Sequence, residues 1–497
     1  MSKLNKKLIF YILGLLLMFN GFAMLISAFV SYLTNDGVLN EMTLVSLLVI
    51  FLGWILMAIS KNNDRKINKR DAYFIVVLGW LTMVFSGMLP YIVTESISSF
   101  SNVFFETMSG YTTTGSTVIN DIDALPKSII FWRSMTHWLG GMGIIVLAIA
   151  ILPLLGIGGM QLFSAEAPGL TGDKIHPRIS DTAKRLWLIY VGLTLLETIL
   201  LKFAGMSLFD ALNNSMSNIA SGGFSTKNES IGFWNDAPLI QYIIIFFMFL
   251  AGTNFVLIYF GLTGKFKKIF QDTEFKWYVS FISVFVIVST IILFFNVNLS
   301  STEVYHPEVL GKFESSFRHS LFQVVAIVTT TGFVTGDFVS WTPFLTMLFF
   351  GIMFMGGSSG STSGGVKVLR HLILIKNGFL EFKRSLHPNA IFPLRHNNHV
   401  VEKPIIIHVL AFFILYLILF IIGAGVLSAL GLDFASAIGG AASSLGNVGP
   451  ALGSLGPITN FDSLPEIGKY WCSFLMLVGR LELFTVLIFF TPYFWKN

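Results

Sequence analysis

The chain has little charge, one cysteine and none of the common nucleotide-binding motifs. Lys, Arg, Asp and Glu make up 12% of its 497 residues, about half the share found in an average soluble domain. Cys472 is the single cysteine, so the chain can form neither an internal disulfide nor a cysteine-based metal site. It contains no Walker motif and no G-x-G-x-x-G motif, and its nine histidines show no metal-ligand spacing. We therefore expect no cofactor in this chain, and any nucleotide effect would have to come through a partner protein.

Apolar residues, in contrast, make up 54% of the chain and include 50 Phe. Repeated apolar runs reach the ~20 residues that a helix needs to cross a bilayer. The first run, from Leu8 to Tyr32, is too long for a signal peptide and is interpreted as a retained helix. We expect an all-α polytopic membrane protein. The runs predict ten spanning helices, the eighth of them interrupted, at 8–33, 42–60, 72–93, 129–155, 184–204, 237–262, 276–297, 343–376, 404–430 and 467–494.

Basic residues mark alternate loops between these helices. Most of the 32 Lys and Arg lie in the N-terminus and in the segments 61–70, 161–185, 264–276 and 366–403. Positively charged loops remain in the cytoplasm, so both termini are predicted to be cytoplasmic. The basic loops could in addition bind anionic lipid or a partner protein. The loops on the opposite side are acidic. Either they are ordinary solvated loops, or their charges produce an electric field that concentrates cations at the mouth of a pore.

Four connections on the acidic side are too long for simple turns. Those after the third, fifth, seventh and ninth helices each hold an apolar stretch too short to span the membrane, which predicts a re-entrant helix. A turn of small residues follows each stretch, and such backbone is tolerated at membrane depth only where protein covers it or it lines a water-filled cavity. The turns are Thr112–Ser116, Ala220–Phe224, Thr329–Phe333 and Ser443–Asn447, and their glycines, Gly115, Gly223, Gly332 and Gly446, recur at a near-constant period.

This period predicts four helix–pore-helix–helix repeats in a pseudo-fourfold arrangement, after an N-terminal helix pair. The predicted boundaries are 1–70 for the N-terminal two-helix segment and 71–160, 161–265, 266–385 and 386–497 for pore repeats 1 to 4. On the ring axis, carbonyl and hydroxyl oxygens can replace the hydration shell of a hard monovalent cation, and glycine lets the backbone crowd there. The candidate ion-binding residues are Thr113, Thr114, Gly115, Ser221, Gly222, Gly223, Thr330, Thr331, Gly332, Ser444, Leu445, Gly446 and Asn447.

With these turns and the motif Trp138–Ile144 (WLGGMGI), the chain resembles the Trk/Ktr/HKT superfamily of potassium transporters, and most of all its bacterial TrkH/TrkG branch. The resemblance covers essentially the whole chain. It implies K⁺ as the transported ion, a homodimer in the bacterial inner membrane, and a cytosolic TrkA-type nucleotide-binding ring as regulator. The second and fourth turns lack the Thr-Thr-Thr-Gly of the first and third. A ring of such unequal turns is expected to be less strictly selective for K⁺ than a ring of four identical strands.

The resemblance also points to a gate. The run Gly356–Gly365, which includes Gly357, Gly360 and Gly364, interrupts the eighth predicted helix, because glycine costs about 1 kcal/mol per helical position. It is interpreted as an intramembrane loop below the selectivity filter that the four turns are predicted to form, and the alternative is a cytoplasmic linker. Arg480 lies deep in the tenth predicted helix, where a charge is costly and usually functional. It is placed in the permeation path by resemblance, or else it forms a structural ion pair, for example with Glu197.

Two other functions compete with a K⁺ pathway. An unrelated secondary transporter with re-entrant helices would commonly show twofold inverted repeats, whereas this chain repeats fourfold and in parallel. A membrane enzyme would need a cluster of acids or histidines at one membrane face, and none stands out in the sequence. We therefore expect a transporter or channel subunit and not an enzyme.

Overall fold

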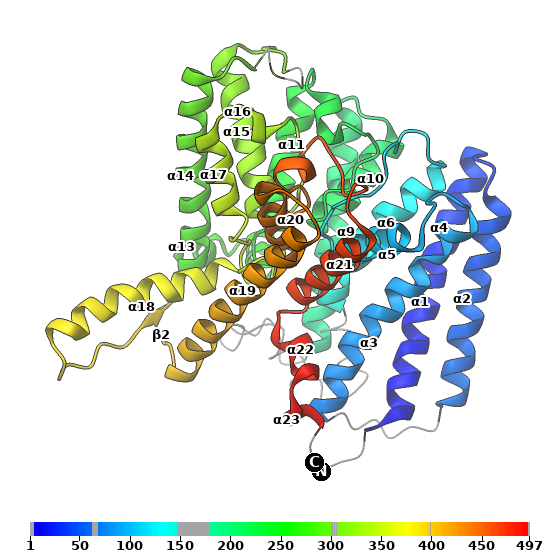
Figure 1. Cartoon of the computed structure of the whole chain (residues 1–497), viewed down its shortest axis with the longest axis horizontal. Helices are drawn as coiled ribbons and strands as arrows, with labels where there is room; N and C mark the ends of the chain where they lie inside the picture. The colour runs from blue at the N-terminus through cyan, green and yellow to red at the C-terminus, as the bar shows by residue number, and fades with distance from the viewer. Residues whose placement is uncertain are drawn as a thin grey trace.

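The protein is helical almost throughout (Figure 1). The structure is a computed structural model that describes residues 4–61, 68–146, 179–299, 302, 304, 306–397 and 399–495. Its strands in this part of the chain are β1 (Arg395–His396) and β2 (His399–Val400), which form a small antiparallel hairpin. Within these residues, six helices are long and apolar enough to cross a membrane, and there are up to eight spans if each of two bent helix pairs counts as one.

The N-terminal helix pair is confirmed. It consists of α1 (Lys6–Thr34) and α2 (Leu39–Ile59), joined by a turn that begins at Asn35 with a φ of 50°. The two helices cross where Gly14 meets Gly53. A Cβ on either glycine would lie 2.7 Å from the other's carbonyl oxygen, so only glycine permits this close packing.

Four repeats of the same order follow, each with a long helix, a short helix, a turn and a second helix. The first repeat contains α3 (Lys69–Gly87), α4 (Leu89–Val93), α5 (Phe100–Tyr111) and α6 (Lys127–Val146). The second contains α9 (Ile179–Phe203), α10 (Leu208–Ile219), η3 (Ser230–Trp234), α11 (Pro238–Ala251), α12 (Phe255–Leu262) and α13 (Phe266–Gln271). The third contains α14 (Thr273–Asn296), α15 (Lys312–Val328), α16 (Phe338–Trp341), α17 (Pro343–Ile352) and α18 (Val368–Leu386). The fourth contains α19 (Lys403–Ala429), α20 (Phe434–Gly446), η5 (Gly453–Leu455), α21 (Glu466–Arg480), α22 (Phe484–Leu487), η6 (Ile488–Phe490) and α23 (Pro492–Trp495).

The short helices α5, α10, α15 and α20 are mostly buried. The side chains of Ser99, Ser207 and Asp433 accept hydrogen bonds from the first turns of α5, α10 and α20, as N-caps do. Pro238 and Pro343 open the second helices α11 and α17, where a missing N–H has no cost. The predicted pseudo-fourfold order of helices is therefore confirmed, while the exact boundaries of the repeats stay a prediction.

Two of the predicted straight spans are bent. The span predicted at 237–262 breaks between α11 and α12 with an angle of 110°, and the span predicted at 467–494 breaks after α21 with an angle of 111°. At the first break Asn254 caps α12 by accepting from the backbone N–H of Val256. At the second, Glu482 and Leu483 adopt φ angles of 57° and 43°, which cannot continue a right-handed helix. The predicted interruption of the eighth helix is confirmed, and the end of the fourth, 147–155, lies outside the described residues.

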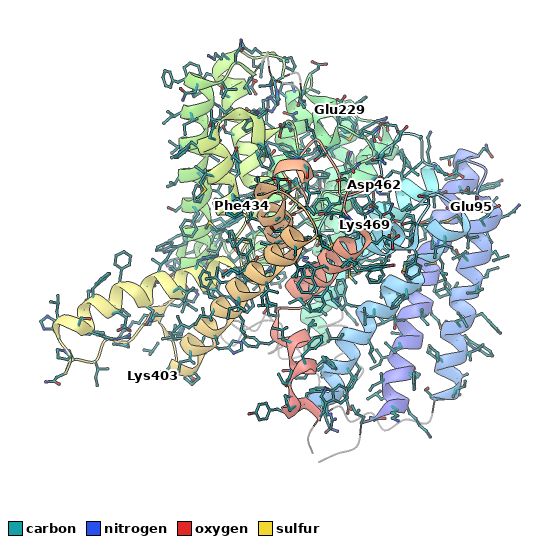
Figure 2. All side chains as sticks on the ribbon, in the orientation of Figure 1. Glu95, Glu229, Lys403, Phe434, Asp462 and Lys469 are labelled. Carbon is teal, nitrogen blue, oxygen red and sulfur yellow. The ribbon has the colours of Figure 1, made fainter. Side chains whose placement is uncertain are left out.

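The outer surface is apolar around the helices. Large apolar side chains are exposed on α2, α14 and α19, among them Phe51, Trp54, Ile287, Ile291 and Ile421. A soluble monomer rarely exposes so much apolar surface, whereas lipid covers it in a bilayer. Acidic side chains such as Glu95, Glu229 and Asp462 lie on the side away from the chain termini, and Lys403 lies on the side of the termini (Figures 1 and 2). The protein is a multi-pass membrane protein.

Candidate ion-permeation site

The four turns after the short helices share one backbone conformation. In each turn a non-glycine residue takes a left-handed φ, and a glycine two positions later has a positive φ as well. The first residues are Thr113 (51°), Ser221 (56°), Thr330 (54°) and Asn447 (53°), and the glycines are Gly115 (84°), Gly223 (78°), Gly332 (74°) and Gly449 (105°). In every turn the residue before that glycine also donates its N–H to the carbonyl five positions earlier. The repetition seen in the sequence is therefore a repetition of backbone geometry.

The register predicted for the fourth turn is wrong by three residues. Gly446 is the last residue of α20 and has no positive φ, whereas Gly449 does. In the hydrogen-bond pattern, Val448 takes the place that Thr114 has in the first turn. Ser444 and Leu445 therefore belong to the end of the short helix, and the turn itself consists of Asn447, Val448 and Gly449.

The four turns close a ring. A Cβ built on the glycine of one turn would meet a carbonyl oxygen of the next turn, at distances that real Cβ atoms essentially never show. The pairs are Gly115 with Gly222 (2.1 Å), Gly223 with Thr331 (2.1 Å), Gly332 with Val448 (2.1 Å) and Gly449 with Thr114 (2.8 Å). The last contact joins the fourth turn back to the first. Glycine is thus required at these positions both by its φ and by the approach of the neighbouring turn.

Oxygen atoms dominate this ring, but its four parts are unequal. Thr112 and Thr114 share a hydroxyl hydrogen bond of 2.8 Å, and Thr329 and Thr331 repeat it in the third turn. The second turn has no threonine. In the fourth, the amide of Asn447 donates to the Thr114 hydroxyl at 3.0 Å and thereby ties the fourth turn to the first. The predicted ligand residues of the first three turns, together with Asn447, are all brought together here.

A buried ion pair supports the first turn from behind. Arg133 Nε of α6 lies 2.9 Å from Glu106 Oε1 of α5, and both side chains are at most 1% exposed. The other Glu106 oxygen accepts from the N–H of Val118, and Arg133 also donates to the carbonyl of Ser225 beyond the second turn. The guanidinium lies 4.2 Å from the ring centre of Phe224. The pair therefore fixes the first and second turns against each other.

The glycine-rich run from Gly356 to Gly365 packs directly against the ring. Most of it is buried, which contradicts a solvated linker. Thr362 shares a hydroxyl hydrogen bond of 2.9 Å with Ser221, and the N–H of Gly364 donates to the Thr330 hydroxyl at 2.6 Å. A Cβ on Gly364 would lie 2.8 Å from Asn447 Cβ. The loop thus touches the second, third and fourth turns at their left-handed residues.

The break between α11 and α12 holds the other side of this loop. The N–H of Ser358 donates to the carbonyl of Gly252 at 2.8 Å, and the N–H of Phe255 donates to the carbonyl of Gly360 at 3.1 Å. Glu274, in the first turn of α14, accepts from the N–H of Ser359 at 2.6 Å. The bend in α11–α12 therefore gives the loop the backbone partners that a straight helix would have used internally.

Arg480 is bound to the loop. It lies at the end of α21, where its guanidinium donates to the carbonyl oxygens of Thr362 (2.9 Å) and Gly140 (3.4 Å). Glu197 instead accepts from the amide of Asn218 at 2.6 Å. The predicted alternative of an ion pair between Arg480 and Glu197 is therefore wrong for the described structure. Gly479 beside Arg480 lets α21 approach α20, because a Cβ there would lie 2.0 Å from the Leu445 carbonyl oxygen.

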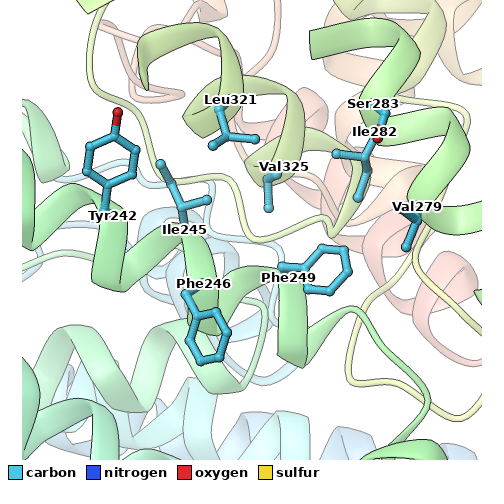
Figure 3. A pocket seen from close by; sticks show the side chains of 9 residues that line it. All are labelled: Tyr242, Ile245, Phe246, Phe249, Val279, Ile282, Ser283, Leu321 and Val325. Carbon is cyan, nitrogen blue, oxygen red and sulfur yellow. The ribbon is translucent and has the colours of Figure 1, made fainter. Parts of the chain in front are cut away.

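An apolar groove lies apart from this site. It has a volume of about 350 Å³ and opens between α11, α14 and α15 (Figure 3). Its lining includes Ile245, Phe249, Ile282 and Leu321, and its polar groups are few. Such a surface offers no set of oxygen ligands, so the ring of turns remains the candidate ion site.

Comparisons with known proteins identify the family of the chain. Residues 39–496 match the TrkH family model, which is described as a cation transport protein. The chain belongs to the TrkH family. It is 40% identical to the Trk system potassium uptake protein TrkH of Escherichia coli K12 over 98% of both chains, and 34% identical to that organism's TrkG over 88% of both. The crystal structure of the potassium transporter TrkH from Vibrio parahaemolyticus superposes with a TM-score of 0.87, at 35% identity, and covers 99% of this chain and 100% of the other.

Family membership makes this TrkH-family chain a transport protein and not an enzyme. Sequence reasoning had missed several residues of its site. Gly449 was overlooked because Gly446 lies only three residues earlier, although Pro450 after Gly449 marks the turn. Glu274 lies just before the predicted span 276–297, in the segment 264–276 that was noted only for its basic residues. The bend at Gly252 had a weak signal, since the polar pair Thr253–Asn254 interrupts an apolar run.

Proposed function

We propose that this TrkH-family protein takes up K⁺ through the ring of four turns. The single observation that supports this most is the closure of the ring, in which each turn's glycine abuts a carbonyl of the next. Related proteins from Escherichia coli are named potassium uptake proteins. A ring of backbone carbonyls is the arrangement that replaces the hydration shell of K⁺ in selective pores.

The selective ligands are the oxygens of the left-handed residues and of the residues before the glycines. In the first turn these are Thr113 and Thr114, and the equivalent positions of the fourth are Asn447 and Val448. The Thr113 hydroxyl oxygen is buried without a hydrogen-bond partner among the described residues, which leaves it available to an ion. Oxygen ligands suit hard cations such as K⁺ and disfavour soft transition metals.

The glycine-rich loop and Arg480 form the gate. The loop binds the second and third turns through Thr362 and Gly364, and Arg480 holds the Thr362 carbonyl. A fixed positive charge beneath the ring repels a cation that leaves it. Opening would require the Arg480–Thr362 bond to break and the loop to move away from the turns.

The membrane orientation and partners follow from charge. We place the chain in the inner membrane of a bacterium, with both termini in the cytoplasm. The reason is that the basic segments, including 366–403, lie on the same side of the membrane as the termini when successive spanning helices alternate in direction. Helix α18 and the β1–β2 hairpin extend beyond the helix bundle (Figure 1). This projection is the surface we assign to contacts with a second copy of the chain and with a cytosolic TrkA-type nucleotide-binding ring.

Uptake of radioactive Rb⁺ into vesicles that contain the purified protein tests the function. The expected result is Rb⁺ uptake that excess K⁺ competes away and that equal Na⁺ leaves largely intact. Gly332→Ser should weaken this discrimination, and Gly351→Ser is the matched control, since a Cβ at Gly351 meets nothing within 4 Å. Equal discrimination in both variants would remove the turns from the pathway and would favour a secondary transporter with a site elsewhere.

A further inference from the structure

A carboxyl group without a counter-charge lies behind the second pore helix. Glu197 is in the C-terminal third of α9 and is 0% exposed. Its Oε1 accepts from Asn218 Nδ2 of α10 at 2.6 Å, and the same amide nitrogen donates to the carbonyl of Ile244 in α11 at 3.1 Å. The two bonds occupy both hydrogens of the amide, which fixes the identity of the amide nitrogen and oxygen of Asn218.

This pair leaves two oxygens without a donor. Glu197 Oε2 and Asn218 Oδ1 are both buried, and neither has a hydrogen-bond partner among the described residues. Both atoms are acceptors when the carboxyl is ionised. Burying two such acceptors costs free energy, and an unpaired buried carboxylate costs far more. One hydrogen shared between the two oxygens would satisfy both of them.

No charged group of the packed helices compensates Glu197. On α9 itself, Arg185 donates to Tyr259 of α12, and Lys202 lies in the last turn. On α10, Asp210 accepts from Ser207 and Thr226. On α6, Arg133 pairs with Glu106, and His137 shares a hydrogen bond with Ser217. In the described part of the chain, no ion pair or hydrogen bond joins any of these groups to Glu197.

We propose that Glu197 and Asn218 form a proton-binding site, in which a proton on Glu197 Oε2 is shared with Asn218 Oδ1. Together with the existing bond from Nδ2 to Oε1, this proton closes a two-bond ring between acid and amide. A metal cation would need about six oxygen ligands, and the pair offers two. One carboxylate also neutralises a single positive charge, which one proton supplies.

Two backbone carbonyls of α10 connect this site to the second turn of the ring and to the glycine-rich loop. The carbonyl of Asn218 accepts from the N–H of Ser221, the left-handed residue of the second turn. The next carbonyl, of Ile219, accepts from the Thr362 hydroxyl of the glycine-rich loop at 2.9 Å. A bound proton thus holds the end of α10 in the position that the second turn and the loop require. This role rests on the proposed function, whereas proton binding itself does not.

Infrared difference spectroscopy of the purified protein during a pH titration tests the site without any transport. The wild-type protein should show the C=O stretch of a protonated carboxylic acid at neutral pH, and that band should be absent in Glu197→Gln. The exposed Glu229→Gln is the matched control and should keep the band. Asn218→Ala retains the acid and removes the amide, so its band should shift to higher frequency. The absence of a Glu197-dependent band, or its replacement by Na⁺-dependent binding, would overturn the proposal.

Rb⁺ uptake in vesicles over the same pH range tests the coupling. Wild-type discrimination of Rb⁺ from Na⁺ should fall as alkaline pH removes the band, because the bare carboxylate no longer holds Asn218. Glu197→Gln carries a fixed donor in place of the proton, so its discrimination should stay constant across the titration. A Glu197→Gln protein whose discrimination falls with pH as in wild type would overturn the coupling. Loss of uptake at every pH with an intact band would instead count against the proposed function alone.

Discussion

Replacing Gly449 by alanine distinguishes the fourth turn observed in the structure from the one that the sequence period suggests. Gly449 has a φ of +105°, a conformation that costs an L-residue roughly 1–2 kcal/mol. A Cβ there would also lie 2.8 Å from the carbonyl oxygen of Thr114, a backbone atom that has little freedom to move. Together the two effects give at least about 2 kcal/mol, and every 1.4 kcal/mol is about tenfold. The selective form of the ring should therefore fall roughly 30-fold in population.

Gly446→Ala is the matched control, because Gly446 is helical. A Cβ at this position would lie 3.1 Å from Met353 O and from Val448 Cγ2. Shifts of a few tenths of an ångström in these neighbours relieve both contacts. Alanine is also about 1 kcal/mol more favourable than glycine inside a helix. The assay is Rb⁺ uptake in vesicles with increasing Na⁺ as competitor. We expect lost discrimination in Gly449→Ala and near-normal discrimination in Gly446→Ala. The reverse result would refute the register described here.

Three other changes test the gate, the support of the ring and the outer loops. Arg480→Ala should raise resting Rb⁺ flux about 10-fold or more, because it removes a charged hydrogen bond to Thr362 worth ~1.5–3 kcal/mol. Unchanged flux in a well-expressed protein would contradict a gating role. Glu106→Gln should lower the free energy of unfolding by about 3–5 kcal/mol, since it leaves Arg133 buried and unpaired, and thermal unfolding measures it. The pKa of Asp462 is lowered, chiefly because its carboxylate accepts a hydrogen bond from the Asn120 side chain. The contribution of this carboxylate to stability is therefore present near neutral pH and is lost as pH falls through the lowered pKa. Asp462→Asn should therefore reduce the unfolding temperature at pH 7 and leave it unchanged in strong acid, and an equal loss at both would contradict the assignment.

The architecture was predictable because its signals are local. Apolar run length, loop charge and the recurrence of Gly115, Gly223 and Gly332 each lie in short stretches of sequence, and each reflects a strong constraint of the bilayer or the backbone. The glycine-rich run itself predicted the interruption at Gly356–Gly365, and the family resemblance added its interpretation as a gate. The structure shows the run as a mostly buried loop.

The parts that could not be predicted depend on contacts between distant segments. Pro450 is a local signal for a turn at Gly449, but the approach of Thr114 from the first repeat is what requires glycine there. Arg480 was predicted to lie along a straight helix, but the chain turns directly after it, and its partner Thr362 is more than a hundred residues away. The left-handed conformation of Leu483 has no sequence signal at all, since a bulky residue is disfavoured there.

The orphan oxygens of Glu197 and Asn218 were equally invisible in the sequence. The sequence showed a carboxylate and a basic residue at membrane depth, and an ion pair between them was the alternative to a place for Arg480 in the permeation path. Helix packing instead places Glu197 against the short helix α10 and Arg480 against the glycine-rich loop. The hydrogen-bond partner of each group lies on a different segment of the chain, and no local sequence pattern could identify it.

The central claim, that the four turns bind K⁺ on a common axis, is tested most directly by locating the ion. A structure determined with the protein in Rb⁺ gives an anomalous signal from Rb⁺ itself. We expect ordered Rb⁺ on the ring axis, coordinated by the carbonyl oxygens of Thr114, Gly222, Thr331 and Val448. Ordered Rb⁺ bound only away from this ring, with the four turns intact and empty, would contradict the account.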